Sequence, residues 1–314
     1  MLHGLAGQAL AFVAALALAP LLSGWVAQCR AWLQNRTAPP LWQPWLVLHK
    51  RLLRETVVAE NASPLFRSVP ALVFACMAIV CTIIPTLSTD LPLAVVADAV
   101  VLVGLLALAR VLLSLAAMDV GTAFGTLGAR RDMMVGFLAE PVLLMVLFTA
   151  ALGARSTSLA SIVDVLAHRE LAIMPSLAFA GVAFTMVSLA ENGRIPVDNP
   201  TTHLELTMIH EALTLEYSGQ HLALIEWAAT LKLFAYSCIG IALFCPWGLA
   251  ADDTPLALLL AVPALVAKLA IGGMLLAIAE TVSAKMRIFR VPEYLGIAFV
   301  LAVIGMLIHI LLGA

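Results

Sequence analysis

Long apolar runs separated by short polar connections dominate the sequence. Each run has about twenty residues, the length that an α-helix needs to cross the hydrocarbon core of a bilayer. They cover residues 4–27, 69–89, 93–117, 133–153, 173–191, 221–245, 255–280 and 291–313. Continuous runs of this kind predict helices rather than barrel strands, because a lipid-exposed backbone must satisfy its own hydrogen bonds. We therefore expect an all-α, polytopic integral membrane protein with about eight transmembrane helices.

The connection after the first run is longer and has a different pattern. In "LWQPWLVLHKRLLRETVVAE", apolar and basic residues recur at helical spacing. The apolar positions are Leu41, Trp45, Leu48, Leu52 and Leu53, and the basic ones beside them are Lys50, Arg51 and Arg54. An apolar face next to clustered positive charge is typical of a helix that lies in the membrane interface. We expect such an amphipathic helix within residues 41–57.

The composition agrees with a membrane protein and narrows the functional classes. Of the 314 residues, 63% are hydrophobic and 11% are charged, and we find no internal repeat. The simplest expectation is a single membrane domain over residues 1–314. A formal net charge of -2 without a basic stripe argues against nucleic acid as a partner. The first run lacks a basic start and exceeds the core of a signal peptide, so we expect it to be retained as a span.

The cysteines and histidines do not form a metal-binding pattern. The five cysteines contain no CxxC pair, and all except Cys29 lie inside apolar runs. His203 and His210 are seven residues apart, whereas a zinc pair on a helix is usually four apart and has further ligands nearby. We expect no metal, cluster or disulfide in this chain.

The basic residues predict the orientation in the membrane. With the N-terminus outside, the outer connections contain Arg155 and Arg169, and the inner ones contain twelve lysines and arginines. These twelve are Arg30, Arg36, Lys50, Arg51, Arg54, Arg67, Arg130, Arg131, Arg194, Lys285, Arg287 and Arg290, while Arg110, Lys232 and Lys268 fall inside runs. We expect a multi-pass protein of the cytoplasmic (inner) membrane of a prokaryote, with both termini on the outer side.

Several ionisable residues fall inside the apolar runs or at their edges: Asp98, Glu140, Glu226, Glu280, Lys232 and Lys268. Each costs roughly 2.5–3.5 kcal/mol at a helix centre, so a bundle that keeps several should use them. Asp98 and Glu280 lie near uncertain helix ends and fit structural pairs equally well. For Glu140 and Glu226 we favour proton-relay carboxylates, buried without a permanent cation partner, so that burial stabilises the neutral form. Glu226 and Lys232 lie on different faces of one helix and should pair with neighbouring helices.

The connection "AENGRIPVDNPTTHLELTMIHEALTLEYSG" (residues 190–219) contains an unusual concentration of ionisable groups. Pro196 and Pro200 interrupt the helix, and Thr201 or Thr202 can cap a new one. Its charges alternate with apolar residues, whereas a solvated loop seldom does so. We therefore expect a re-entrant or buried segment whose polar groups line a wet cavity or a partner's surface.

The same connection resembles the third inner loop of the family that contains subunit 1 of respiratory complex I. "DNPTTHLELTMIHEA" is similar to the hydrogenase branch, the membrane subunits of formate hydrogenlyase and related group 4 nickel-iron hydrogenases. Three further blocks have counterparts in the same order: "QNRTAPPLWQP", "LARVLLSLAAMDVGTAFGTLGARRDMMVGFLAEP" and "ETVSAKMRIFRVPEYLG". The resemblance covers nearly the whole chain.

The resemblance implies a subunit without a catalytic centre. Its partners would be a nickel-iron large subunit, a small iron-sulfur subunit, a polyferredoxin-like subunit and antiporter-like membrane subunits. The nickel-iron centre and the iron-sulfur clusters would belong to those partners. Family positions and buried lysines then give the expected ion path: Glu140, Glu191, Asp198, Glu205, Glu216, Glu226, Lys232 and Lys268. The expected docking residues for the soluble module are Arg131, Arg194, Lys50 and Arg54.

Two departures from the complex I pattern bear on a quinone site. Val47 occupies the usual aspartate position after "QP", and Thr201, Thr202 and His203 replace acidic residues. Both changes weaken the case for a quinone headgroup site, and the second is the pattern of the hydrogenase branch. A quinone-site subunit of a complex I-like dehydrogenase is the nearest alternative. A stand-alone ion or solute transporter is the alternative from another class, but such folds usually show inverted repeats.

Overall fold

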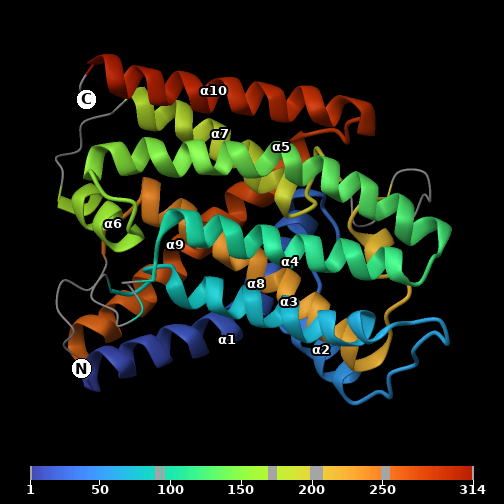
Figure 1. Cartoon of the computed structure of the whole chain (residues 1–314). Helices are drawn as coiled ribbons and strands as arrows, with labels where there is room; N and C mark the ends of the chain where they lie inside the picture. The colour runs from blue at the N-terminus through green and yellow to red at the C-terminus, as the bar shows by residue number, and fades with distance from the viewer. Residues whose placement is uncertain are drawn as a thin grey trace.

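The computed structural model describes residues 2–88, 93, 96–168, 175–198, 208–248 and 255–312. Eight helices in these ranges coincide with the eight predicted spans (Figure 1). They are α1 (Leu2–Leu33), α3 (Pro64–Ile83), α4 (Ala99–Asp119), α5 (Ala123–Ala154), α7 (Pro175–Glu191), α8 (Gly219–Phe244), α9 (Pro255–Val282) and α10 (Val291–Leu312). Within the described ranges, seven helices are long and apolar enough to cross a membrane, and α7 is a shorter apolar helix of 17 residues. The all-α prediction is confirmed.

The predicted amphipathic helix is present as α2 (Gln43–Leu52). Pro44 lies in its first turn, where proline has no backbone hydrogen bond to lose. Leu48 is buried, whereas Leu46 and Lys50 are exposed. Trp45 packs edge-on against Trp227 of α8, with 5.4 Å between the ring centroids. The helix therefore rests across one end of the bundle (Figure 1).

Three short elements differ from the predictions. The helix expected after Thr201 or Thr202 is wrong in its described part, because residues 208–218 contain only the 3-10 turn η2 (Glu211–Leu213). The helix α6 (Leu159–His168) buries Leu159, Ile162 and Val163 against the bundle. The 3-10 turns η2 and η3 (Ile288–Arg290) follow other connections. All three are too short to give a spanning apolar run, so a search by span length does not detect them.

The helices pack as a bundle in which α4 lies between α3 and α5, and α5, α7 and α10 all pack against one another (Figure 1). Helix α8 packs against α3 and α1, and α9 packs against α1. Small residues bring neighbours close: a Cβ on Gly305 of α10 would lie 2.8 Å from the carbonyl oxygen of Ser176 on α7. Such close approach is typical of membrane helices, whose association depends on van der Waals packing.

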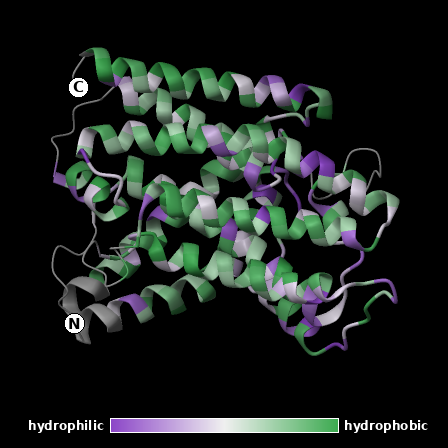
Figure 2. Cartoon of the chain, viewed as in Figure 1, coloured by the Kyte–Doolittle hydropathy of each residue, from purple (hydrophilic) through white to green (hydrophobic). Residues whose placement is uncertain are grey.

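Hydrophilic residues gather at the end of the bundle that contains α2 (right in Figure 2). We call this end the basic face; it comprises residues 34–63, 120–122, 192–198, 208–218 and 283–290. The end where α1 begins and α10 ends is called the opposite face. Hydrophilic residues also occur within the bundle, on helices α4, α5 and α8 (Figure 2).

Candidate functional site

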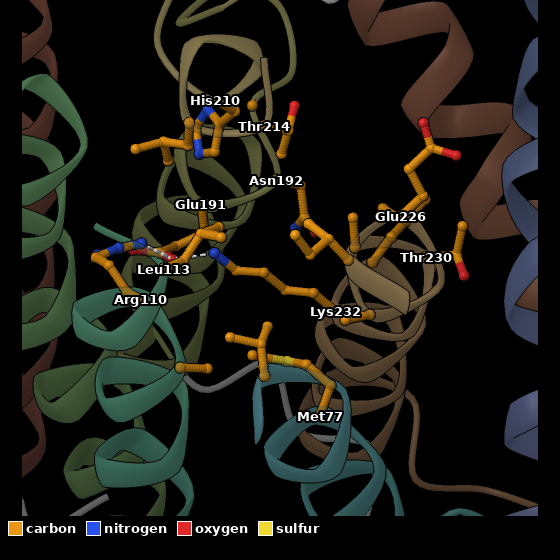
Figure 3. A pocket seen from close by; sticks show the side chains of 18 of the residues that line it. Met77, Arg110, Leu113, Glu191, Asn192, His210, Thr214, Glu226, Thr230 and Lys232 are labelled. Carbon is orange, nitrogen blue, oxygen red and sulfur yellow. Dashed lines mark hydrogen bonds and ion pairs between the residues drawn. The ribbon is translucent and has the colours of Figure 1, made fainter. Parts of the chain in front are cut away.

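A cavity of about 380 Å³ lies where the basic face meets the bundle (Figure 3). One wall is apolar and comes from α3, α4 and α8, with Val73, Met77, Leu106 and Ile225 among its residues. The other wall is polar. It consists of Arg110, Asp132, Glu191, Asn192, Arg194, Asp198, His210, Glu211, Thr214, Glu226, Thr230 and Lys232. The crowded connection of residues 190–219 thus forms part of the lining in its described residues, as we expected from its alternating pattern.

Arg110 of α4 is the centre of the charged groups beside this cavity. Its side chain is only 5% exposed and is paired with three carboxylates from two other helices. It contacts Glu191 of α7, and its Nη1 and Nε atoms lie 3.3 Å from Glu140 and 3.5 Å from Asp132 of α5. A guanidinium suits this position because its planar fork presents several donors at once. Gly136 of α5 makes room for it, since a Cβ there would overlap the arginine side chain.

Glu191 is shared by two cations that approach from different helices (Figure 3). Lys232 of α8 donates to Glu191 with 2.8 Å between Nζ and Oε2, while Arg110 contacts the same oxygen. Glu191 is buried at the last residue of α7, where the helix dipole disfavours a negative charge. The two cations compensate for this location. The expectation that Lys232 pairs with a neighbouring helix rather than with Glu226 is confirmed.

A second group of charges links this cluster to the basic face. Asp132 of α5 lies 3.3 Å from Nε2 of His210, and Asp198 lies 3.5 Å from Nδ1 of the same ring. Asp198 in turn lies 3.5 Å from Nζ of Lys285. Both aspartates are buried. The chain of contacts therefore runs from Lys285 through Asp198, His210 and Asp132 to Arg110.

The comparisons with known proteins identify the family of this chain. The family model described as NADH dehydrogenase matches residues 7–311. The chain belongs to this family. It is similar to formate hydrogenlyase subunit 4 of Escherichia coli (strain K12), with 32% identity over 277 residues, which are 88% of this chain and 89% of that protein. Hydrogenase-4 component C of the same organism is 32% identical over 293 residues, 92% of this chain and 91% of that protein.

A solved structure shares the fold. The matching chain belongs to the membrane-bound sulfane sulfur reductase, an archaeal respiratory membrane complex, and the TM-score is 0.82 at 19% sequence identity. The match covers 97% of this chain and 98% of the other. The family resemblance found in the motifs is thereby confirmed, and the apolar helices make this family member a multi-pass membrane protein.

Glu226 lies at the rim of the cavity, where α2 crosses α8. It contacts Arg51 of α2, whose pKa is lowered by partial burial. The expectation that Glu140 and Glu226 lack a permanent cation partner is therefore wrong: Arg110 faces the first and Arg51 the second. The reason is that both partners come from other helices, at sequence separations that local spacing does not reveal.

The residues expected to dock a soluble module have different surroundings. Lys50 and Arg54 are exposed at and just beyond the end of α2. Arg131 donates to the carbonyl oxygen of Met208 at 3.0 Å, so it holds the 208–214 segment against α5. Arg194 lies 3.1 Å from Glu280 of α9, a carboxylate that Arg30 also approaches at 3.4 Å. Glu280 is thus a structural ion-pair partner, one of the two roles that the sequence allowed.

Two of the charges singled out from the apolar runs lie away from the cluster, near the opposite face. Lys268 of α9 donates to the carbonyl oxygen of Cys245 at 2.8 Å and also to that of Trp247. Both carbonyls follow the end of α8, so this lysine stabilises a helix C-terminus and does not join Glu191 or Lys232. Asp98 accepts from the backbone of Val100 at 2.8 Å and caps α4.

Two expected path residues are not part of the contacts described above. Glu205 lies outside the described residues, as do Thr201, Thr202 and His203. Glu216 is partly exposed in the connection just before α8. Among the described residues, no group of three or more histidine, cysteine or carboxylate side chains is placed to hold a metal ion. The chemistry that the described groups support is proton or cation binding by ion-paired carboxylates.

Proposed function

We propose that this chain is the membrane anchor and coupling subunit of a formate hydrogenlyase or related group 4 nickel-iron hydrogenase complex. In this role it docks the soluble redox module on the basic face and links electron transfer to the movement of protons or sodium ions. The observation that carries the proposal is the buried cluster of Arg110, Glu191, Lys232, Glu140 and Asp132 beside the cavity. The two relatives of similar length support the class of complex.

The charge balance of this cluster gives it a reason to bind a cation. Three carboxylates face two cations in the described structure, so the fully ionised cluster has one excess negative charge. An uncompensated charge in a low-dielectric interior is costly, and binding one proton or one sodium ion removes it. A change of charge in a module docked at the cavity mouth would shift that binding, because charges interact strongly where water is scarce. Redox events in the partner would thus alter ion occupancy here.

The proposed path uses the remaining acidic residues at the basic face. Glu226 and Asp198 line the cavity mouth, and we assign Glu205 and Glu216 to the same path on the module side. Lys50 and Arg54 are exposed beside this mouth and would contact acidic side chains of the soluble subunits. The nickel-iron centre and iron-sulfur clusters would lie in a large subunit, a small iron-sulfur subunit and a polyferredoxin-like subunit. Antiporter-like membrane subunits would receive the ions.

The experiment separates docking from coupling in one set of preparations. The complex is extracted from native membranes in mild detergent, and its subunits, its hydrogenase activity with an artificial electron donor and its ion uptake in vesicles are measured. Reversing both charges with Lys50→Glu and Arg54→Glu should release the redox subunits, because the docking surface loses its positive potential. Glu140→Gln should retain the subunits and artificial-donor activity but lose ion uptake, because the partly exposed Glu140 leaves Arg110 paired with Glu191 and Asp132. Recovery of this chain without any redox subunit from native membranes would contradict the anchor role.

Quinone binding in the same cavity is the second candidate function. The apolar wall beside a charged end favours it, and the volume falls in the range of small-molecule sites. Val47, which occupies the usual aspartate position, argues against quinone binding. Quinone-dependent oxidation of the electron donor by the purified complex, abolished by Met77→Trp in the apolar wall, would support this alternative. Activity that is independent of added quinone would exclude it.

A further inference from the structure

His210 lies between two buried aspartates, and each ring nitrogen faces one of them. Nδ1 is 3.5 Å from Asp198 and Nε2 is 3.3 Å from Asp132. The ring lines the cavity and is 29% exposed to it. We propose that His210 is the proton relay that joins the basic face to the Arg110 cluster, a role that rests on the proposed ion-coupling function. Imidazole suits this position because it can accept a proton on one nitrogen while releasing another from the opposite nitrogen.

The backbone around His210 is built to bring the ring to this position. Gly193 has φ of +58°, and a Cβ there would lie 2.8 Å from Nδ1 of His210. Glycine is therefore needed both for the turn and for the close approach of the ring. From the other side, a Cβ on Gly128 would lie 2.6 Å from the Cβ of Ala212, so the 208–214 segment sits directly on α5. The hydrogen bond from Arg131 to Met208 fixes the same segment.

Charged groups from several elements surround the ring. Asp132 faces it from α5 and Asp198 from the connection after α7, while Glu211 adjoins it in its own segment. Lys285 is ion-paired with Asp198, and Arg110 is ion-paired with Asp132. The described contacts thus place a cation at each end of an aspartate–histidine–aspartate row. Such a row can pass a proton without moving either cation.

The transfer conserves protons at every atom. A proton on the Asp198 carboxyl moves to Nδ1 of the Nε2–H tautomer, and the imidazolium then releases the Nε2 proton to the Asp132 carboxylate. The net result is one proton moved from Asp198 to Asp132, with the ring left as the Nδ1–H tautomer. The ring regains the Nε2–H tautomer when Nε2 takes up a proton from water in the cavity and Nδ1 then releases one to that water. Both separations are longer than the ~2.9 Å of a typical hydrogen bond and must shorten during transfer, as contacts of this kind do in working complexes.

Replacing His210 in the complete complex tests the relay. His210→Gln keeps a planar polar side chain that cannot carry a proton, and His210→Ala leaves room beside the cavity for free imidazole. We expect both variants to retain the redox subunits and artificial-donor hydrogenase activity but to lower proton uptake by roughly 100-fold, the scale of a lost proton-transfer group. Imidazole added to His210→Ala should restore uptake in proportion to its concentration. His168→Gln, on an exposed ring near the opposite face, is the matched control and should leave uptake unchanged.

A purely structural histidine predicts a different pattern. If His210 only holds the two aspartates together, His210→Gln keeps normal uptake or imidazole fails to restore His210→Ala, and either result overturns the relay. A second measurement is independent of ion uptake. In the purified complex containing nitrogen-15 histidine, Asp132→Asn and Asp198→Asn should each shift the pH titration of the His210 ring. Absence of both shifts also overturns the relay. A complex that moves no ions in its unaltered form contradicts the proposed function instead, and the titration still tests the row.

Discussion

The two ends of the membrane bundle use charged side chains in different ways. At the opposite face, Lys268 and Asp98 each contact backbone groups at the end of a helix. Beside the basic face, Arg110 and Lys232 both contact Glu191, which links three helices next to a cavity. Charges of both kinds lie in apolar stretches of the sequence and look alike there.

The difference lies in what a change of protonation would do. A lysine bound to carbonyl oxygens stabilises a helix end, and those oxygens do not titrate. In the cluster, each group sets the charge of the next, so adding one proton alters several ion pairs at once. Buried, mutually paired carboxylates beside a cavity are therefore better candidates for ion coupling than equally buried single charges.

The largest expected effect follows from removing the centre of the cluster. Arg110→Met leaves Asp132, Glu140 and Glu191 without their shared cation, and breaking such buried pairs costs about 3–5 kcal/mol. We expect little of the variant in membranes and a lower unfolding temperature of any complex recovered. Arg110→Lys should be intermediate, because an ammonium cannot span three carboxylates. Arg36→Met, at an exposed position, is the matched control, and equal loss in both methionine variants would refute the central role of Arg110.

Glu140→Gln changes the charge of the cluster with a smaller expected loss of stability than Arg110→Met. Arg110 keeps Glu191 and Asp132, and the Glu140 side chain is 30% exposed, so we expect a stability change below ~1 kcal/mol. The excess negative charge is gone, however, and ion uptake should be lost while artificial-donor activity remains. Glu226→Gln should also assemble and lower uptake, but less, because Arg51 and Glu226 form a separate pair at the rim. Normal uptake in both variants would remove them from the path.

The sequence predicts the fold well and the site only in part. Eight apolar runs and one amphipathic segment are local patterns, and each matched a helix. The pairing is not local. Asp132 falls just before the predicted span 133–153, whereas α5 begins at Ala123, so the span pattern does not place this carboxylate inside a helix.

Arg110 was visible as a charge inside a run, but no role could be assigned without knowing which helices face it. The only indication in the sequence is the high free-energy cost of an unpaired arginine inside a span, which implies that carboxylates from other helices must face Arg110. Lys268 is the opposite case: its position inside an apolar run predicts a residue of the ion path, but its contacts in the structure are with backbone groups. Its partners are carbonyl oxygens at the end of α8, which every sequence contains and no residue type reveals.

At the opposite face, Lys268→Met should cost stability without affecting coupling. The ammonium interacts with the C-terminal end of α8, and a cation at such an end contributes about 0.3–1 kcal/mol. We expect a small decrease in the unfolding temperature of the complex and unchanged ion uptake. Loss of uptake at normal stability would return Lys268 to the ion path and remove the distinction between the two faces. Lys268→Arg, which keeps the cation, should behave as the unaltered protein.

The smallest effect is expected at Asp98, the N-cap of α4. Its carboxylate accepts from the backbone of Val100, and asparagine performs the same capping role about equally well. Asp98→Asn should therefore be nearly neutral, whereas Asp98→Ala should lower stability by about 1 kcal/mol because the amide of Val100 and the hydroxyl of Thr157 both lose their acceptor. The two variants separate charge from capping, because asparagine removes only the charge, whereas alanine removes both the charge and the capping oxygen. If thermal unfolding shows equal loss in both variants, the charge matters more than the cap. If Asp98→Asn alone abolishes ion uptake, this aspartate belongs with Glu191 rather than with Lys268.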